Sequence, residues 1–286
     1  MIRRPWYAGS RESKNPKTGR GTFPPDQIIQ EPGAVLCRVS KTFLRFAQLE
    51  LFIKRKEYQL ALELADYACY KEFNHLLEEG DIIDCNADSK GEIRHGHPKR
   101  YVQLFKEIGN AVSNLVVEWL RVGYVQGNMN SDNTLLGGRT LDYGPYGWME
   151  KFDPLYQPFT SDMDGKFAFM RQPSAMHVNM CVLGECFDSM IRFRCGQLDL
   201  SDEESQTYIS DIDNYCKDGF SDMFQTKFND MRCNKLGLDT WNDSDNELYS
   251  ELEQNMYESC VDYTMFYREL AAVTSNDTPM QALIKL

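Results

Sequence analysis

A broad apolar stripe between residues 98 and 122 constrains the fold more than any other feature of this chain. Its members recur every three or four residues, which places them on one face of an α-helix. They are Tyr101, Leu104, Phe105, Ile108, Val112, Leu115, Trp119 and Leu120. Pro98 suits the first turn of such a helix, and Gly123 suits the residue that follows its end. We therefore expect a helix over residues 98–122 with one face buried in the core.

The other apolar patterns predict a mainly α fold with a small β-hairpin component. Residues 33–39 form a short apolar stretch that is typical of a buried strand. Residues 40–52 are expected to be helical, because Phe43, Phe46 and Leu49 recur at helical spacing, and these aromatic side chains are expected in the core. Further helices are predicted at residues 56–79, 174–195, 202–235 and 245–273.

The polar, Gly-rich segment 124–150 follows the long helix and gathers oxygen-bearing side chains. Residues 134–136 and 140–141 fit two short strands around the Gly137-Gly138 turn, which predicts a hairpin. Asp132 and Asn133 precede this hairpin and Asp142 follows it. Carboxylate and carboxamide oxygens suit Mg²⁺, so these residues are candidates for a phosphoryl- or nucleotidyl-transfer site. The alternative is an Asx-rich turn whose side chains cap backbone amides.

The composition limits which binding partners and which cellular compartment are expected for this chain. The net charge of -12 over 286 residues argues against nucleic acid as the main partner, since phosphate backbones require clustered Lys and Arg. No apolar run reaches membrane-spanning length, so no membrane partner is expected. The nine cysteines include no Cys-x-x-Cys pair, which favours a reduced, intracellular chain. Zinc is not expected, and His95 and His97 are expected to be solvated in a polar loop.

The order of these elements is similar to the C-terminal lobe of a protein kinase, where a long helix precedes a catalytic loop, a short hairpin and a metal-binding Asp. Four sequence blocks are more specific. They are Gly127-Asn-Met-Asn-Ser-Asp-Asn133 with Leu141-Asp-Tyr-Gly-Pro-Tyr-Gly147, the run from Glu31 to Phe46, Arg171-Gln-Pro173 with Asn179 beyond it, and Asp262-Tyr-Thr-Met-Phe-Tyr-Arg268. Together they resemble the selenoprotein O family over about residues 31–272. That family consists of kinase-fold enzymes that transfer AMP, rather than phosphate, to protein hydroxyls.

The resemblance implies a role for each candidate residue. Asp132 matches the catalytic carboxylate, while Asn133 and Asp142 match the ligands of Mg²⁺, with Mn²⁺ as an alternative ion. Asp142 would also contact the nucleotide. Arg38 and Arg45 match two arginines that grip the terminal phosphate of an inverted ATP. The α-phosphate then faces a Ser, Thr or Tyr hydroxyl of a protein substrate, AMP is transferred and pyrophosphate leaves. The alternative for the two arginines is salt bridging at the surface or between lobes.

The sequence also departs from the family pattern. Gln126 stands where much of the family has a histidine, so a proton-related role at that position is lost and only a structural hydrogen bond could remain. The family's N-terminal lobe is not visible in residues 1–30, which we interpret as an irregular tail or linker. Residues 31–286 are interpreted as a kinase-like C-lobe that is helical from about residue 174.

These departures leave the activity of the chain open. A partial chain without most of the N-lobe is expected to be weakly active or inactive. The alternatives are a catalytically dead kinase-like binding module and an ordinary protein kinase. Members of the family occur in mitochondria and in bacteria, so a mitochondrial and a cytoplasmic location both remain open.

Overall fold

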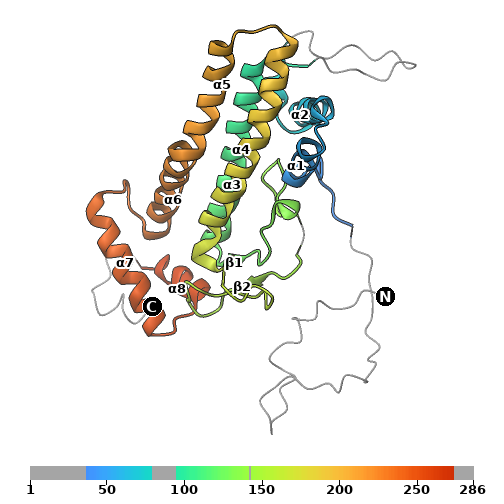
Figure 1. Ribbon diagram of the computed structural model, residues 1–286. Helices are drawn as coiled ribbons and strands as arrows, with labels where there is room; N and C mark the ends of the chain where they lie inside the picture. The colour runs from blue at the N-terminus through green and yellow to red at the C-terminus, as the bar shows by residue number, and fades with distance from the viewer. Residues whose placement is uncertain (1–36, 79–94, 142, 274–286) are drawn as a thin grey trace, which may run out of the picture.

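The computed structural model describes residues 37–78, 95–141 and 143–273, and this part of the chain is mainly helical. The long helices α3 (Pro98–Arg121) and α4 (Gln172–Gln197) run side by side, and α5 (Asp202–Asn214), which continues into α6 (Phe220–Leu236), runs alongside them (Figure 1). A two-stranded antiparallel sheet of β1 (Tyr124–Val125) and β2 (Gly147–Trp148) lies beyond the end of α3. None of the helices in the described part is both long and apolar enough to cross a membrane. The described cysteines are free thiols.

Helix α3 confirms the helix expected from the apolar stripe and forms the centre of the core. Pro98 occupies its first turn, and the helix ends at Arg121, one residue before the predicted end. Of the eight stripe residues, Leu115 is partly buried and the others are buried. Helices α4 and α6 pack against α3. Burial of this stripe is one of the hydrophobic contributions that stabilise the fold.

The first helices begin and end differently from the prediction. Residues 37–39 are irregular and exposed, so this part of the predicted strand 33–39 is wrong; residues 33–36 lie outside the described residues. Helix α1 (Phe46–Lys54) begins at Phe46 rather than Ser40, and α2 (Tyr58–Glu72) ends earlier than predicted. The side chain of Phe43 is 44% exposed, whereas Phe46 is 1% exposed, so Phe43 does not belong to the core as expected.

The reason for the late start of α1 is long-range backbone pairing. The amide of Phe46 donates to the carbonyl of Thr134 at 3.0 Å, and the amide of Leu136 donates to the carbonyl of Leu44 at 2.9 Å. Arg45 and Leu135 form an antiparallel bridge. These bonds hold residues 44–45 in an extended conformation, which overrides their helical spacing.

The two helices predicted in the C-terminal part of the chain, at residues 202–235 and 245–273, are each interrupted in the structure. Helices α5 and α6 are joined by a π-helical turn (Tyr215–Gly219). The helix predicted at 245–273 is divided into α7 (Asp243–Glu258) and α8 (Tyr263–Leu270). The break is caused by pairing with another loop, because the amide of Phe152 donates to Val261 O at 2.9 Å and the amide of Tyr263 donates to Glu150 O at 2.7 Å.

A buried carboxylate, Asp66 of α2, organises the chain just before α3. It accepts hydrogen bonds from Arg100 Nη2 at 2.8 Å and from Tyr101 Oη at 3.0 Å, and it lies 2.7 Å from His95 Nδ1. The expectation that His95 is solvated is therefore wrong. A buried charge requires such partners, because an unpaired carboxylate in the core would be strongly destabilising. His97 instead accepts a hydrogen bond from the backbone of Lys99 at the start of α3.

Two glycines allow the π-helical turn to pack closely against the central helices. A Cβ atom at Gly184 of α4 would lie 2.6 Å from Cys216 Sγ, and a Cβ atom at Gly109 of α3 would overlap the hydroxyl of Tyr215. Gly196, near the end of α4, has no neighbouring atom within 4 Å of the same position. Gly184, in the interior of α4, is therefore closely packed, whereas Gly196, near the end of the same helix, is not.

We expect Gly184→Ala to lower the free energy of unfolding, whereas Gly196→Ala should leave it unchanged or raise it. Overpacking costs about 1–3 kcal/mol, while replacing a helical Gly by Ala gains about 1 kcal/mol. Urea denaturation of both variants measures the difference. Equal changes in the two variants would contradict close packing at Gly184.

Candidate functional site

The predicted site segment forms a loop that begins and ends in the small sheet. Tyr124 pairs with Trp148 and Val125 with Gly147, so β1 and β2 close the base of the loop. The hairpin expected over residues 134–141 is reduced to one antiparallel bridge between Thr134 and Thr140. Trp119 Nε1 donates to Thr140 Oγ1 at 3.0 Å, which fastens this turn to α3.

Two polar side chains of α4 hold the loop between β1 and β2 by hydrogen bonds. Asn179 Nδ2 donates to Met129 O at 2.6 Å and to Thr134 Oγ1 at 3.3 Å. Gln172 accepts from the amide of Gln126 at 3.0 Å and donates to Tyr124 O at 3.0 Å. Sequence reasoning did not assign these positioning roles to Gln172 and Asn179. Both residues belong to one of the sequence blocks that resemble the selenoprotein O family, which was the available signal.

Gln126 makes the structural hydrogen bond that was considered possible for it. Its side chain is 1% exposed and accepts a hydrogen bond from Tyr124 Oη at 2.6 Å. A carboxamide thus satisfies a buried hydroxyl at this position without carrying charge.

Gly127 brings the two halves of the loop into direct contact. Its φ of +78° lies in the left-handed region, and a Cβ atom at this position would overlap the carbonyl oxygen of Pro145. Only glycine meets both conditions without strain. Residue 127 therefore sets the distance between the loop that carries Asp132 and the residues that follow Asp142.

Asp132 and Asn133 lie together in a 3₁₀ turn (Ser131–Asn133), with Asp132 exposed and Asn133 half-buried. Neither side chain forms a hydrogen bond or ion pair with any other described residue. The Asx-turn hydrogen bond is made instead by Asn128, whose Oδ1 accepts from the amide of Asn130 at 3.3 Å. Capping of backbone amides, the alternative interpretation, is therefore not what Asp132 and Asn133 do within the described residues.

The predicted metal ligands are described only in part, because Asp142 lies outside the described residues. Within residues 37–78, 95–141 and 143–273, no three His, Cys, Asp or Glu side chains gather as a metal cluster. The predicted Mg²⁺ ligands are a carboxamide, that of Asn133, and the carboxylate of Asp142, and this pair is not a cluster of that kind. The ligand roles of Asn133 and Asp142 stay predictions.

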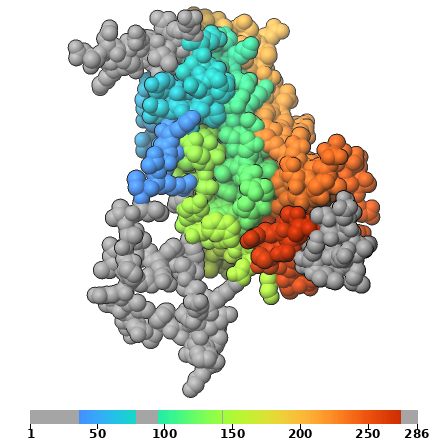
Figure 2. Space-filling view, turned by 180° about the vertical axis from the view of Figure 1, so that it is seen from behind, coloured from blue at the N-terminus to red at the C-terminus, as the bar shows by residue number. Residues whose placement is uncertain are grey.

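Both predicted phosphate-binding arginines lie against this loop. Arg45 Nη1 donates to Asp132 O at 3.2 Å. Arg38 donates to Leu141 O, and its guanidinium carbon lies 5.4 Å from the ring centroid of Tyr143. Neither arginine forms an ion pair with a described carboxylate, so the salt-bridge alternative is not observed in this part of the chain. In Figure 2 the segment that begins at residue 37 (blue) adjoins the loop residues (yellow-green) on one face.

Arg139, at the tip of the turn, anchors the segment that carries the two arginines. It forms a bidentate pair with Glu72 of α2, in which Nη1 lies 2.9 Å from Oε2, and its Nε donates to Ser40 Oγ at 3.0 Å. Thr42 Oγ1 donates to the same carboxylate at 2.5 Å. Burial raises the pKa of Glu72, but the hydrogen bonds from Arg139 and Thr42 outweigh it and hold the pKa below its usual value.

Comparison with known proteins identifies relatives along most of the chain. The family model described as protein adenylyltransferase SelO matches residues 15–284, a wider range than the expected 31–272. The protein nucleotidyltransferase YdiU of Flavobacterium johnsoniae is 31% identical over 258 residues, which cover 90% of this chain and 43% of that protein. The proteins of the same name from Rhodopirellula baltica and Maridesulfovibrio salexigens are each 32% identical; the matches cover 85% and 90% of this chain and 40% and 47% of those proteins. The chain thus spans less than half the length of these curated relatives.

Gly127→Ala is expected to destabilise the chain more than Gly165→Ala. Both glycines have positive φ, but a Cβ atom at Gly165 would have its nearest neighbour at 3.5 Å, whereas at Gly127 it would meet the Pro145 backbone. The left-handed conformation alone costs a non-glycine residue about 1–2 kcal/mol. Thermal and urea denaturation should show a loss of that order for Gly165→Ala and a larger loss for Gly127→Ala. Equal losses would show that the contact with Pro145 does not restrict the loop.

Proposed function

Because the chain belongs to the protein adenylyltransferase SelO family, we propose that it carries the catalytic residues of an enzyme that transfers AMP from ATP to Ser, Thr or Tyr hydroxyls of proteins. The chain spans less than half of its curated relatives, so the activity of a whole protein is part of this proposal. We further propose that its helices form a protein-kinase-like C-lobe. This is supported by the order of a long helix, a loop with Asp132, a small antiparallel sheet and a helical remainder.

The observation that carries the proposal is the position of two arginines beside the loop. Arg45 contacts the backbone of Asp132, and Arg38 contacts the backbone of Leu141, next to Asp142. A guanidinium binds two phosphate oxygens at once and keeps its charge at any relevant pH. Phosphate held at this place would lie next to the loop that carries the proposed acid–base residue.

Asp132 is the proposed catalytic carboxylate. Its side chain is exposed and has no partner among the described residues, so it can accept a proton from an incoming hydroxyl. The hydroxyl oxygen then forms a bond to the α-phosphorus of ATP while the bond to the β-phosphate oxygen breaks. AMP becomes attached to the protein substrate, and pyrophosphate leaves with the former bridging oxygen.

Asn133 and Asp142 are the proposed ligands of Mg²⁺, or alternatively Mn²⁺. The donor set fits such an ion, because the Asn133 carboxamide makes no other hydrogen bond in the described part and oxygen is the donor that Mg²⁺ prefers. When bound, the ion would neutralise charge on the phosphates. Inversion of ATP follows if Arg38 and Arg45 hold the terminal phosphate, because the α-phosphate is then the one presented to Asp132.

Label transfer separates AMP transfer from the alternatives. With Mg²⁺ present, any activity of the chain, which is expected to be weak, should transfer label from α-labelled ATP to a protein acceptor, and Asp142→Ala is expected to abolish this transfer. Transfer from γ-labelled ATP alone would identify an ordinary protein kinase. Absence of both transfers, together with no thermal stabilisation by ATP and Mg²⁺, would favour a binding module without catalysis.

Substitution of the two arginines tests the phosphate assignment. Arg38→Ala and Arg45→Ala should each lower kcat/KM for ATP by about 10- to 100-fold, since a hydrogen bond to a charged group contributes about 1.5–3 kcal/mol. Replacing either arginine by lysine should restore little of the lost kcat/KM, because lysine lacks the planar guanidinium that binds two phosphate oxygens at once.

Arg192→Ala is the matched control for these variants. Arg192 lies on α4 in an exposed pair with Asp188 and should leave kcat/KM unchanged. If Arg192→Ala lowers kcat/KM as much as Arg38→Ala and Arg45→Ala, the effect is one of overall charge and the assignment is wrong.

A further inference from the structure

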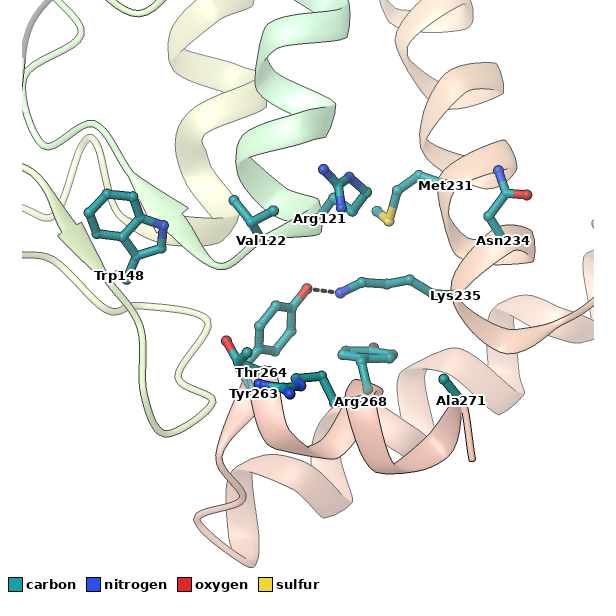
Figure 3. Close-up of a pocket in the computed structure, with 11 residues that line it drawn as sticks. Arg121, Val122, Trp148, Met231, Asn234, Lys235, Tyr263, Thr264, Arg268 and Ala271 are labelled. Carbon is teal, nitrogen blue, oxygen red and sulfur yellow. Dashed lines mark hydrogen bonds between the residues drawn. The ribbon is translucent and has the colours of Figure 1, made fainter. Parts of the chain in front are cut away.

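A cavity of about 690 Å³ lies between the end of α3, β2, α6 and α8 (Figure 3). It is separate from the candidate site, since Arg38, Arg45, Asp132 and Asn133 do not line it. Its volume falls within the range of small-molecule sites in proteins, about 300–1,000 Å³. Most of its wall is apolar or aromatic, with Trp148, Tyr263 and Tyr267 among the lining residues.

The charged side chains of this cavity all have the same sign. Arg121, Lys235 and Arg268 line it, and no carboxylate of the described residues does. The chain as a whole carries 43 acidic and 31 basic residues, so a purely cationic lining is the opposite of its average surface. Such a lining favours an anion as the ligand.

Lys235 is the most deeply placed of the three cations. Its Nζ lies 2.6 Å from Tyr263 Oη, and it lies 3.5 Å from the ring centroid of Tyr267. Tyr263 Oη itself donates to Leu120 O at 2.8 Å, so Lys235 is the donor to Tyr263. This bond uses one of the three donors of an ammonium group.

No described carboxylate lies within ion-pair distance of Lys235. Burial, reinforced by Arg121, lowers the pKa of Lys235 to about 7, although Glu253 of α7 acts in the opposite direction. Tyr263 and Tyr267 are the other titratable groups that face it, and burial raises the pKa of both. The ammonium form therefore lacks an ion-pair partner among the described residues, and a bound anion would supply one.

The two arginines lie at the outer part of the cavity. Arg121 pairs with Glu118 of its own helix, with Nη2 2.6 Å from Oε2. Arg268 of α8 is exposed and has no hydrogen-bond or ion-pair partner among the described residues. Arg268 and Lys235 thus both retain donors for a ligand. The half-exposed ring of Trp148 in β2 lines the opposite side of the cavity, beyond Val122 (Figure 3).

We propose that this cavity binds a small organic anion with a planar apolar body, whose carboxylate or phosphate is held by Lys235 and Arg268. The body lies along the apolar lining that extends from Lys235 towards Trp148. Because Trp148 belongs to the strand that closes the candidate site loop, a ligand here contacts an element shared with that loop. The proposal does not depend on AMP transfer.

Calorimetric titration of the chain with 1-naphthoate tests the need for charge, with 1-naphthalenemethanol as the uncharged probe of the same ring system. Naphthoate is expected to bind at least about 10-fold more tightly, because ionic hydrogen bonds contribute roughly 1.5–3 kcal/mol. Lys235→Met and Arg268→Gln should each remove about 10-fold or more of the naphthoate affinity. Arg192→Gln, on the remote face of α4, should remove none. Equal affinity for the two probes, or unchanged affinity in Lys235→Met, overturns the proposal.

Two further measurements test where naphthoate binds and whether binding requires protonated Lys235. Naphthoate should shift the NMR resonance of the Trp148 indole N–H, which is identified by its loss in Trp148→Phe. A shift of the Trp119 or Trp241 resonance instead would show that naphthoate binds elsewhere and would overturn the proposal. Affinity should fall as the pH rises from 6 to 8, because Lys235 loses its proton, and this fall should vanish in folded Lys235→Met. A comparison with 1-naphthyl phosphate then identifies the preferred anionic group.

Discussion

Backbone pairing between residues 44–46 and 134–136 is the interaction on which the candidate site depends. It joins two segments that are about ninety residues apart, and it places Arg45 beside Asp132 and Arg38 beside Leu141. Two hydrogen bonds alone would contribute little, since each contributes about 1 kcal/mol net. The buried carboxylate of Glu72 reinforces them, because it binds Arg139 on one segment and Thr42 on the other.

The loop is held equally firmly on its other side. Asn179 and Gln172 project from the rigid helix α4 and satisfy backbone groups at Met129, Tyr124 and Gln126. These contacts fix the main chain and leave the side chains of Asp132 and Asn133 without partners in the described part of the protein. A scaffold that binds the backbone and leaves oxygen donors unengaged is what a preorganised site requires, since those donors need not break existing bonds to meet a ligand.

What the sequence could predict depended on the range of the interactions involved. Helix α3 was predictable because its stripe is a local pattern. Asp132, Asn133 and Asp142 were candidates because they lie within one short segment, whereas Arg38 and Arg45 were found only through the family resemblance. The exposure of Phe43 was not predictable, because its helical spacing is overridden by pairing with residues 134–136. Two other features were unpredictable for the same reason, which is pairing with a distant segment: the bond between Arg139 and Glu72, and the break between α7 and α8. Each depends on a partner that no periodicity or turn motif specifies.

The pairing state of the arginines supplies an argument about ligands that sequence could not supply. In a chain with an excess of carboxylates, a structural arginine has partners available, and Arg100 and Arg139 are indeed bound by Asp66 and Glu72. Among the described residues, Arg38 and Arg45 bind backbone carbonyl oxygens and an aromatic ring and form no ion pair, so no described carboxylate compensates their charge. Uncompensated guanidinium groups held in fixed positions beside a loop attract anions. Arg171 and Arg194 also donate to backbone carbonyl oxygens and form no ion pair with a described carboxylate. The position of Arg38 and Arg45 beside the candidate loop, rather than their lack of an ion pair alone, therefore supports their proposed role in binding phosphate.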